Sequence, residues 1–418
     1  MISYGKIIVL SLLALVLWSA VVLAGALFGW WRQPIAPPDD AQTFLDRAVA
    51  RIKEANRGDA ALVLIEDGTI AGEHYSGSAQ AIDRDTVFPV ASVSKWITAW
   101  GIMSLVEDRR LDLDRPVEEY LTRWKLPSSP FDHRGVTVRR LLSHTAGLTD
   151  GLGFGDYGPD EALPTLEQAL DSPRASSGEP VAIAVGIEPG TEWRYSGGGY
   201  LILELLIEEV SGQPFEAFIR QAVLQPLGMS RSGYGYLGGL ENAAKAYDED
   251  GRSATVYRHV SRAATGFATS AADMARFVLA QLPALTDKPL TQATIDAMRE
   301  PHATLRGVEV WGLGTVLYAP TDGGDFVFGH DGVNEPAVNA SVRVNPDTGD
   351  AIVVLVTGSR TLASELGGHW VFWQTGLPDF FSIPGEIRRV VPVLLGGVLL
   401  ILLAGFAAAW RRRRAARR

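Results

Sequence analysis

Two long apolar runs lie near the ends of the chain, and a mixed pattern fills the region between them. Ile7 to Trp30 and Val390 to Trp410 contain only apolar and small residues. About 20 such residues span a bilayer as a helix, and the tryptophans that end both runs favour the membrane interface. The pattern predicts an N-terminal transmembrane helix within residues 1–32 and a C-terminal one at 390–410.

The region between these runs changes from helical to strand-like periodicity and back. Apolar residues at Phe44, Leu45, Ala48, Val49 and Ile52 follow one helix face and predict a helix at 41–55. The same criteria predict further helices at 92–106, 199–210, 214–223, 271–282, 292–299 and 362–373, strands at 60–66, 70–75, 309–317, 326–329, 337–344 and 351–357, and an irregular lobe at 151–188. Strands and helices do not alternate regularly, which disfavours a doubly wound or barrel fold. The order predicts an α+β domain whose sheet is assembled from both chain ends around a mostly helical insertion.

Short segments connect this domain, residues 41–377, to the two spans. The linker at 33–40 contains three prolines and should be stiff. The linker at 378–389 contains Phe380 and Phe381, which either dip into the membrane interface or pack under the last helix of the domain. Residues 411–418 form a basic tail.

The charge is divided unevenly between the flanks and the domain. The net charge of the chain is −10, yet the tail and the residues next to the spans are basic and contain no acid. The remainder carries 28 basic and 48 acidic residues, a net of −20, which disfavours nucleic acid as a partner. Cysteine is absent, which excludes disulfides, a thiol nucleophile and a cysteine-ligated zinc.

The arginines also predict the orientation in a membrane. Six arginines follow Trp410 and outweigh Arg388 and Arg389 on the other side of the span. By the positive-inside rule both termini lie in the cytoplasm, and the domain lies outside it, on the periplasmic or outer face. Two alternatives stay open: the first run is a signal peptide cleaved near Ala24-Gly25-Ala26, or the second is a buried core helix.

The first candidate for chemistry is Ser92-Val93-Ser94-Lys95. Residues three apart share a helix face, and a neutral lysine next to a serine at the start of a helix can take its proton. The alternative is a serine cap beside a solvated lysine, and Ser3 and Lys6 show the same spacing at a membrane edge. Ser92 is distinguished by a strand and loop before it and an apolar helix after it.

Two further motifs follow along the chain. Tyr195-Ser196-Gly197 stands before a predicted helix, where Tyr195 either projects into a cleft or simply packs. His330-Asp331-Gly332 lies at the end of a predicted strand, where backbone N–H groups can form an oxyanion hole; alternatively, His330 is an ordinary surface or core histidine. No HExxH, GxSxG or phosphate-binding loop occurs, so neither a metal nor a cofactor is expected.

In this order the three motifs resemble those of the serine β-lactamase and penicillin-binding protein family, and above all its class C branch. That branch has SxxK, then YxN, then KTG or HxG on a strand. Further matches extend the resemblance over about residues 41–376, and they are Leu142-Ser143-His144-Thr145-Ala146-Gly147-Leu148, Pro226-Leu227-Gly228-Met229, Ala271-Ala272-Asp273-Met274-Ala275 and Gly332-Val333-Asn334-Glu335. The resemblance implies a β-lactamase-like fold, an antiparallel sheet flanked by helices.

The resemblance also implies roles for individual residues. Ser92 attacks a carbonyl, Lys95 and Tyr195 share the proton transfers, and the N–H groups of Ser92 and Val333 form the oxyanion hole. His330 binds or polarises the substrate. Gly197, Asp331 and Gly332 complete the predicted substrate-binding set.

Three departures from the family pattern shape the expected activity. Gly197 replaces an asparagine, His330 replaces a lysine, and Asp331 places a negative charge where a hydroxyl is common. A β-lactam carboxylate should therefore bind poorly. We expect a D-amino-acid peptidase, carboxypeptidase or esterase that acts on a small-molecule, peptide or ester substrate of the cell envelope. The alternatives are a β-lactamase, a catalytically silent penicillin-binding-like protein, and a structural membrane protein that associates through Gly396, Gly397 and Gly405.

Overall fold

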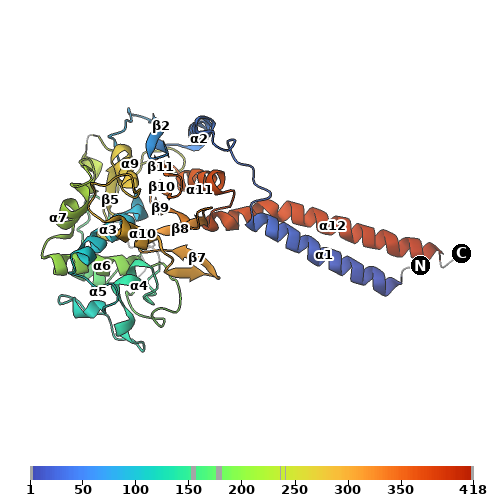
Figure 1. Cartoon of the computed structure of the whole chain (residues 1–418), viewed down its shortest axis with the longest axis horizontal. Helices are drawn as coiled ribbons and strands as arrows, with labels where there is room; N and C mark the ends of the chain where they lie inside the picture. The colour runs from blue at the N-terminus through green and yellow to red at the C-terminus, as the bar shows by residue number, and fades with distance from the viewer. Residues whose placement is uncertain (1–2, 152–156, 176–180, 236, 241, 416–418) are drawn as a thin grey trace.

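The computed structural model describes residues 3–151, 157–175, 181–235, 237–240 and 242–415. Its centre is an eight-stranded sheet with the order β2-β1-β11-β10-β9-β8-β7-β6 (Figure 1). All of its pairings are antiparallel. The strands are β1 (Ala60–Glu66), β2 (Thr69–Ser76), β6 (Ala303–Leu305), β7 (Val308–Trp311), β8 (Val316–Pro320), β9 (Phe326–Asn334), β10 (Val338–Asn345) and β11 (Asp350–Thr357).

Helices cover both faces of this sheet. Successive side chains of a strand point to opposite faces, and β1 accordingly contributes Val63 to the core with Trp96 and Leu62 to the core with Phe44. A strand buried on both faces is apolar throughout, which explains the uninterrupted apolar run in β1. The helices are α2 (Ala41–Ala55) and α11 (Leu362–Thr375) on one face, and α3 (Ser94–Glu107) and α9 (Ala271–Leu279) on the other.

The middle of the chain forms a helical lobe beside the sheet. A small sheet of β3 (Val87–Pro89), β5 (Phe267–Ser270) and β4 (Gly233–Tyr234) joins the lobe to the start of α3. The remaining α-helices of the lobe are α4 (Val138–Leu142), α5 (Leu166–Asp171), α6 (Gly197–Ser211), α7 (Phe215–Ile219), α8 (Arg262–Thr265) and α10 (Gln292–Arg299).

Two long helices, α1 (Tyr4–Leu27) and α12 (Ile383–Ala415), project side by side from the domain, with both chain ends at their far tip (Figure 1). Trp18 Nε1–H donates to the Leu394 carbonyl at 3.1 Å, and a Cβ on Gly397 would lie 2.1 Å from the Trp18 ring. Their outer surface is exposed and apolar, as at Leu17 (67%) and Leu400 (68%). Among the described residues, these two helices are long and apolar enough to cross a membrane.

The predicted fold class is confirmed, while several element boundaries differ. The strand predicted at 309–317 is two strands, β7 and β8, separated at residues 312–315. At this break Gly314 has φ 76° and lies so close to α3 that a Cβ would be 2.3 Å from the Ala99 side chain. The strand predicted at 326–329 continues to Asn334, so the His330 motif lies inside β9. The segment predicted to be irregular contains α5, and its residues 152–156 and 176–180 lie outside the described residues.

Candidate active site

Ser92 is held in a strained turn that leads into α3. The α-helix begins at Ser94, and Ser92 lies in the preceding 3₁₀ turn rather than in the helix that its spacing predicted. Ala91 has φ 45°, a conformation that costs free energy for a residue other than glycine. Ser94 stabilises the turn, because its hydroxyl donates to the Ala91 carbonyl at 2.6 Å and accepts from the Phe267 N–H at 2.9 Å.

Lys95 lies next to Ser92 and is buried. Its Nζ is 3.2 Å from Ser92 Oγ and donates to the Ala264 carbonyl at 2.8 Å. Burial lowers the pKa of Lys95 to about 7, and the negative charge of Asp150 acts in the opposite direction. A lysine with this pKa is partly neutral at neutral pH and can accept the serine proton.

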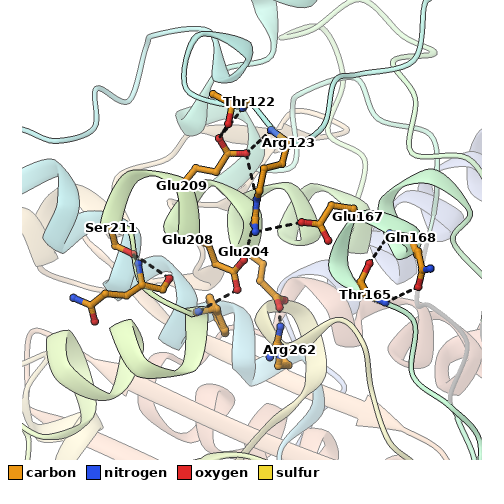
Figure 2. Close-up of polar contacts among 12 residues, drawn as sticks. Thr122, Arg123, Thr165, Glu167, Gln168, Glu204, Glu208, Glu209, Ser211 and Arg262 are labelled. Carbon is orange, nitrogen blue, oxygen red and sulfur yellow. Dashed lines mark hydrogen bonds and ion pairs between the residues drawn. The ribbon is translucent and has the colours of Figure 1, made fainter.

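The carbonyl that positions Lys95 belongs to α8, which is anchored to α6 by a partly buried ion pair (Figure 2). Glu204 of α6 accepts from Arg262 Nε at 2.8 Å and from the Ala263 N–H at 3.0 Å. Glu208 lies one turn further along α6 and contacts Arg123 at 2.6 Å. These contacts fix α8, and with it the acceptor of Lys95, relative to the helical lobe.

Tyr195 lies on the other side of the nucleophile. Both residues line the same cleft, and burial raises the pKa of the Tyr195 phenol, while its interaction with Ser92 acts in the opposite direction. Its ring lies 4.9 Å from Lys95 Nζ and stacks on His144 with centroids 4.3 Å apart. The Ser196 N–H donates to His144 Nδ1 at 3.1 Å, so His144 positions Tyr195 from both its ring and its backbone. In the sequence, His144 was marked only as part of the match at Leu142-Ser143-His144-Thr145-Ala146-Gly147-Leu148.

His330 approaches from β9 as a neutral side chain. Its Nδ1 is 2.6 Å from the Asp331 carbonyl, which can only accept, so Nδ1 carries the proton and Nε2 a lone pair. Burial, reinforced by the nearby charge of Lys95, lowers the pKa of His330 to about 4. Nε2 is buried and has no hydrogen-bond partner among the described residues. His330 can therefore accept a hydrogen bond in the cleft but does not supply a cation.

The edge of β9 approaches the nucleophile closely enough to require glycine. A Cβ on Gly332 would lie 2.1 Å from the Val90 carbonyl oxygen and 3.1 Å from the Ser92 nitrogen. The Gly332 carbonyl accepts from Asn339 Nδ2 at 2.9 Å. Because a trans peptide directs its C=O and N–H to opposite sides, this bond turns the Val333 N–H away from β10. Val333 lines the cleft next to Ser92, as expected of two oxyanion donors.

Asp331 differs from what the sequence predicted. Its carboxylate is paired with the buried guanidinium of Arg343, with Arg343 Nη2 to Asp331 Oδ2 at 2.8 Å. It also accepts from Tyr318 and Ser341, and Arg343 keeps the pKa of Asp331 low although burial alone would raise it. The predicted negative charge is therefore present beside the cleft, but Arg343 compensates it. Arg343 extends the network to Asp379, 2.6 Å away and just before α12.

Arg343 belongs to a polar strip on the face of β10 that lies under α11. The strip consists of Asn339, Ser341, Arg343 and Asn345, all buried. They alternate with the apolar residues of the opposite face, a pattern visible in the sequence Val-Asn-Ala-Ser-Val-Arg-Val-Asn at 338–345. A Cβ on Gly367 of α11 would lie 2.2 Å from Ser341 Oγ. At one end of the strip, Asn339 binds the Gly332 carbonyl of β9. Toward the other end, Arg343 binds Asp379 just before α12.

The cleft between these elements has a volume of about 740 Å³, within the usual range for small-molecule sites. Ser92, Lys95, Tyr195, Gly197, His330, Asp331 and Val333 all line it, together with Trp193, Trp311, Tyr318 and Phe381. Gly197 begins α6. It has no side chain, so the cleft stays open at the position where the family pattern has an asparagine. No cluster of three or more histidine or acidic side chains suited to a metal ion occurs in the described ranges.

Comparison with known families agrees with this geometry. The family model described as Beta-lactamase matches residues 45–371. The chain belongs to the β-lactamase family. The match includes every motif residue that the structure brings to the cleft.

Three curated relatives show the range of the family. Penicillin-binding protein 4 of Amycolatopsis lactamdurans is 28% identical over 399 residues, covering 86% of this chain and 97% of that protein. Penicillin-binding protein 4* of Bacillus subtilis (strain 168) is 31% identical over 184 residues, 43% of this chain and only 38% of that protein. Esterase EstB of Burkholderia gladioli is 29% identical over 208 residues, 44% of this chain and 48% of the esterase.

Solved structures share the fold. The octameric penicillin-binding protein homologue from Pyrococcus abyssi aligns with a TM-score of 0.68 and 24% identity, covering 84% of this chain and 81% of that one. The D-amino acid amidase from Ochrobactrum anthropi SV3 aligns with a TM-score of 0.61 and 22% identity, covering 86% and 98%. The family thus contains penicillin-binding proteins, an esterase and an amidase on one fold.

Proposed function

We propose that this chain is a membrane-anchored serine hydrolase that cleaves ester or amide bonds through an acyl-enzyme on Ser92. The observation that carries the proposal is the placement of Ser92 Oγ 3.2 Å from a buried lysine whose pKa is lowered to about 7. A serine is a weak nucleophile unless an adjacent base removes its proton. Lys95 meets that requirement in both distance and protonation state.

The reaction begins when neutral Lys95 takes the hydroxyl proton and Ser92 Oγ attacks the substrate carbonyl carbon. The N–H groups of Ser92 and Val333 stabilise the resulting oxyanion. The bond to the leaving alcohol or amine then breaks, and Tyr195, whose raised pKa keeps its phenol protonated, passes the proton from Lys95 to the leaving group. Water enters, the same groups work in reverse, and Ser92 is regenerated with release of the carboxylic acid.

The charges around the cleft favour an ester or D-amino-acid peptide over a β-lactam. His330 stands where related enzymes often have a lysine, and its pKa of about 4 keeps it neutral. Arg360 lines the cleft but is paired with Glu335. A substrate carboxylate must therefore compete with an existing ion pair. The names of EstB and of the D-amino acid amidase support the same two substrate classes.

We place the domain on the extracytoplasmic side. The exposed apolar surfaces of α1 and α12 suit a lipid environment, and the arginines at the far end of α12 favour the cytoplasm. The chain lacks cysteine, so single cysteines report topology directly. On intact cells a membrane-impermeant maleimide should label Glu249→Cys in the domain, whereas Arg411→Cys should react only after permeabilisation. The reverse pattern would contradict this orientation.

The decisive experiment on the chemistry is Ser92→Ala in the full-length protein. Wild type should hydrolyse a p-nitrophenyl ester or a D-alanyl peptide, and the variant should lose at least about 10³-fold in kcat, since nucleophile and base act as a unit. Ser104→Ala on the same helix, 3.0 Å from the Gly101 carbonyl, is the matched control and should stay within twofold (about 0.4 kcal/mol).

A fluorophosphonate provides a readout that does not depend on the substrate. Mass spectrometry should find the adduct on Ser92 of wild type and of Ser104→Ala. An unmodified Ser92 in folded wild-type protein would favour the silent penicillin-binding-like alternative. Activity that survives Ser92→Ala would overturn the assignment of the nucleophile.

A further inference from the structure

The residue that closes one side of the cleft belongs to the segment that leads into the membrane helix. Phe381 lines the cleft with Ser92 and Lys95, and its ring lies 6.3 Å from that of Trp193. It is 41% exposed. Phe380 instead packs on the core beneath α11, so the two neighbouring phenylalanines face different surroundings. Phe381 is thus at once part of the cleft wall and an exposed aromatic group.

Phe381 lies close to the apolar part of α12. The helix begins at Ile383, and the apolar span begins at Val390. Nine residues at 1.5 Å per residue place Phe381 within about 14 Å of the span. The headgroup region outside the hydrocarbon core is roughly 5–8 Å thick on each side. The rim of the cleft therefore lies near the membrane surface.

This juxtaposition is held firmly by buried polar contacts. Asp379 caps the turn that carries Phe381, accepting from the Phe381 N–H at 2.8 Å. The same carboxylate binds Arg343 at 2.6 Å, and Arg343 binds Asp331 beside the cleft at 2.8 Å. Three charged groups thereby connect the start of the membrane segment to the catalytic strand.

The N-terminal helix meets the domain at the same place. Gly29, just after α1, lies so close to α11 that a Cβ would be 2.5 Å from the Phe372 ring. Beyond it, Trp373 Nε1–H donates to the Pro37 carbonyl at 2.7 Å. Both long helices therefore join the domain on the side of α11 (Figure 1). Phe381 of the cleft wall lies in the turn just before α12.

We propose that the substrate is a membrane-resident amphiphile, an ester or amide with a long acyl chain, that enters the cleft from the bilayer past Phe381. This inference rests on the hydrolase function proposed above and names its substrate class. The aromatic rings of Trp193, Trp311 and Phe381 receive the acyl chain. The scissile carbonyl lies against Ser92.

The step conserves atoms and electrons without a further reagent. A bond forms between Ser92 Oγ and the acyl carbon, the bond to the alcohol or amine breaks, and that group leaves with the serine proton. Water then adds to the acyl-enzyme, releases the long-chain acid and restores the hydroxyl. The acid and the leaving group can each return to the membrane or to solvent according to their own polarity.

The test compares two esters of the same leaving group with full-length protein in phosphatidylcholine vesicles. The soluble probe is p-nitrophenyl acetate, and the bilayer-resident probe is p-nitrophenyl palmitate. In Phe381→Ala the ratio of kcat/KM for palmitate to that for acetate should fall about tenfold, because an apolar contact of the chain is lost. Phe381→Leu keeps an apolar side chain and should retain most of the ratio.

A control phenylalanine lies on α12, the helix that follows the turn of Phe381. Phe406 is 72% exposed and remote from the domain, and Phe406→Ala should leave the ratio unchanged. An unchanged ratio in Phe381→Ala, or an equal loss in Phe406→Ala, overturns the inference. Wild-type hydrolysis of acetate but not palmitate overturns this inference alone. Hydrolysis of neither ester also overturns this inference, whereas hydrolysis of both by Ser92→Ala overturns the proposed function as well.

Discussion

The two walls of the cleft use burial in opposite ways. The helical wall contains Lys95 and Tyr195, which are buried among aromatic rings. Burial lowers the pKa of Lys95 and raises that of Tyr195, so that it favours the neutral form of each. On the sheet wall, Asp331 and Arg343 are also buried but retain their charges, because each compensates the other. Burial of an ionisable group thus favours the neutral, reactive form where no counter-charge pairs with it directly, and a fixed charged scaffold where one does.

The two walls are also joined to different parts of the molecule, because the residues that position their side chains differ. Lys95 is positioned by a carbonyl of α8, which Glu204 anchors within the helical lobe. Asp331 is positioned by Arg343, which also binds Asp379 just before α12. The helical wall therefore contains the groups proposed to transfer protons, and the sheet wall joins the cleft to the segment that leads into α12.

The largest effect that distinguishes the walls should come from Arg343→Met. Removal of the guanidinium leaves the carboxylates of Asp331 and Asp379 buried without a counter-charge. We expect the free energy of unfolding to fall by about 3–5 kcal/mol. Urea titration of the full-length protein in detergent, followed by tryptophan fluorescence, measures this change.

A partly exposed ion pair between α2 and α11 provides the control. Arg51 of α2 contacts Glu365 of α11 at 2.9 Å, with both side chains partly exposed, and Arg51→Met should cost less than about 1 kcal/mol. Adding Asp331→Asn and Asp379→Asn to Arg343→Met should recover part of the loss. Equal costs for the two arginines would show that the sheet wall does not depend on its buried charges.

Much of the helical wall could be predicted from the sequence, since its residues occur in short local motifs. The spacing of Ser92 and Lys95 within one turn is a local property, and α2 was predicted with its observed bounds. The strained turn at Ala91 could not be predicted, because a long-range hydrogen bond from the Phe267 N–H to Ser94 Oγ stabilises it. Local periodicity predicted one continuous helix instead.

The sheet wall was harder to predict because its residues act through pairing between distant segments. Asp331 was interpreted as facing the substrate, and its partner Arg343 lies on the neighbouring strand twelve positions away. The alternation of polar residues along β10 was the available signal. Phe381 belongs to the cleft only through the docking of α12, and neither periodicity nor motif spacing contains that information.

A smaller effect should separate the two ends of the polar strip. Asn339 donates to the Gly332 carbonyl and thereby orients the Val333 N–H, whereas Asn345 donates to Gln374 at 2.8 Å. Asn339→Ala should lower kcat about tenfold with little change in KM, because it weakens an oxyanion donor without removing it.

The matched control, Asn345→Ala, removes a similarly buried amide from the other end of the strip. Both variants should lose about 1–2 kcal/mol of stability, but only Asn339→Ala should lose activity. Steady-state kinetics together with urea titration separate the two consequences. Equal kcat values would mean that Asn339 supports the fold and does not position the oxyanion donor.

The smallest effect concerns the pH dependence of activity, which we expect Lys95 of the helical wall to set. Neutral Lys95 is the base, so kcat/KM should rise with pH through about 7 and at pH 6 be about a tenth of its plateau. His330→Gln should leave this midpoint in place, because His330 is already neutral above its pKa of about 4. Asp150→Asn should lower the midpoint, because the charge of Asp150 favours protonated Lys95. If the midpoint moved in His330→Gln but stayed unchanged in Asp150→Asn, the titrating group would belong to the sheet wall. The division of roles between the two walls would then be reversed.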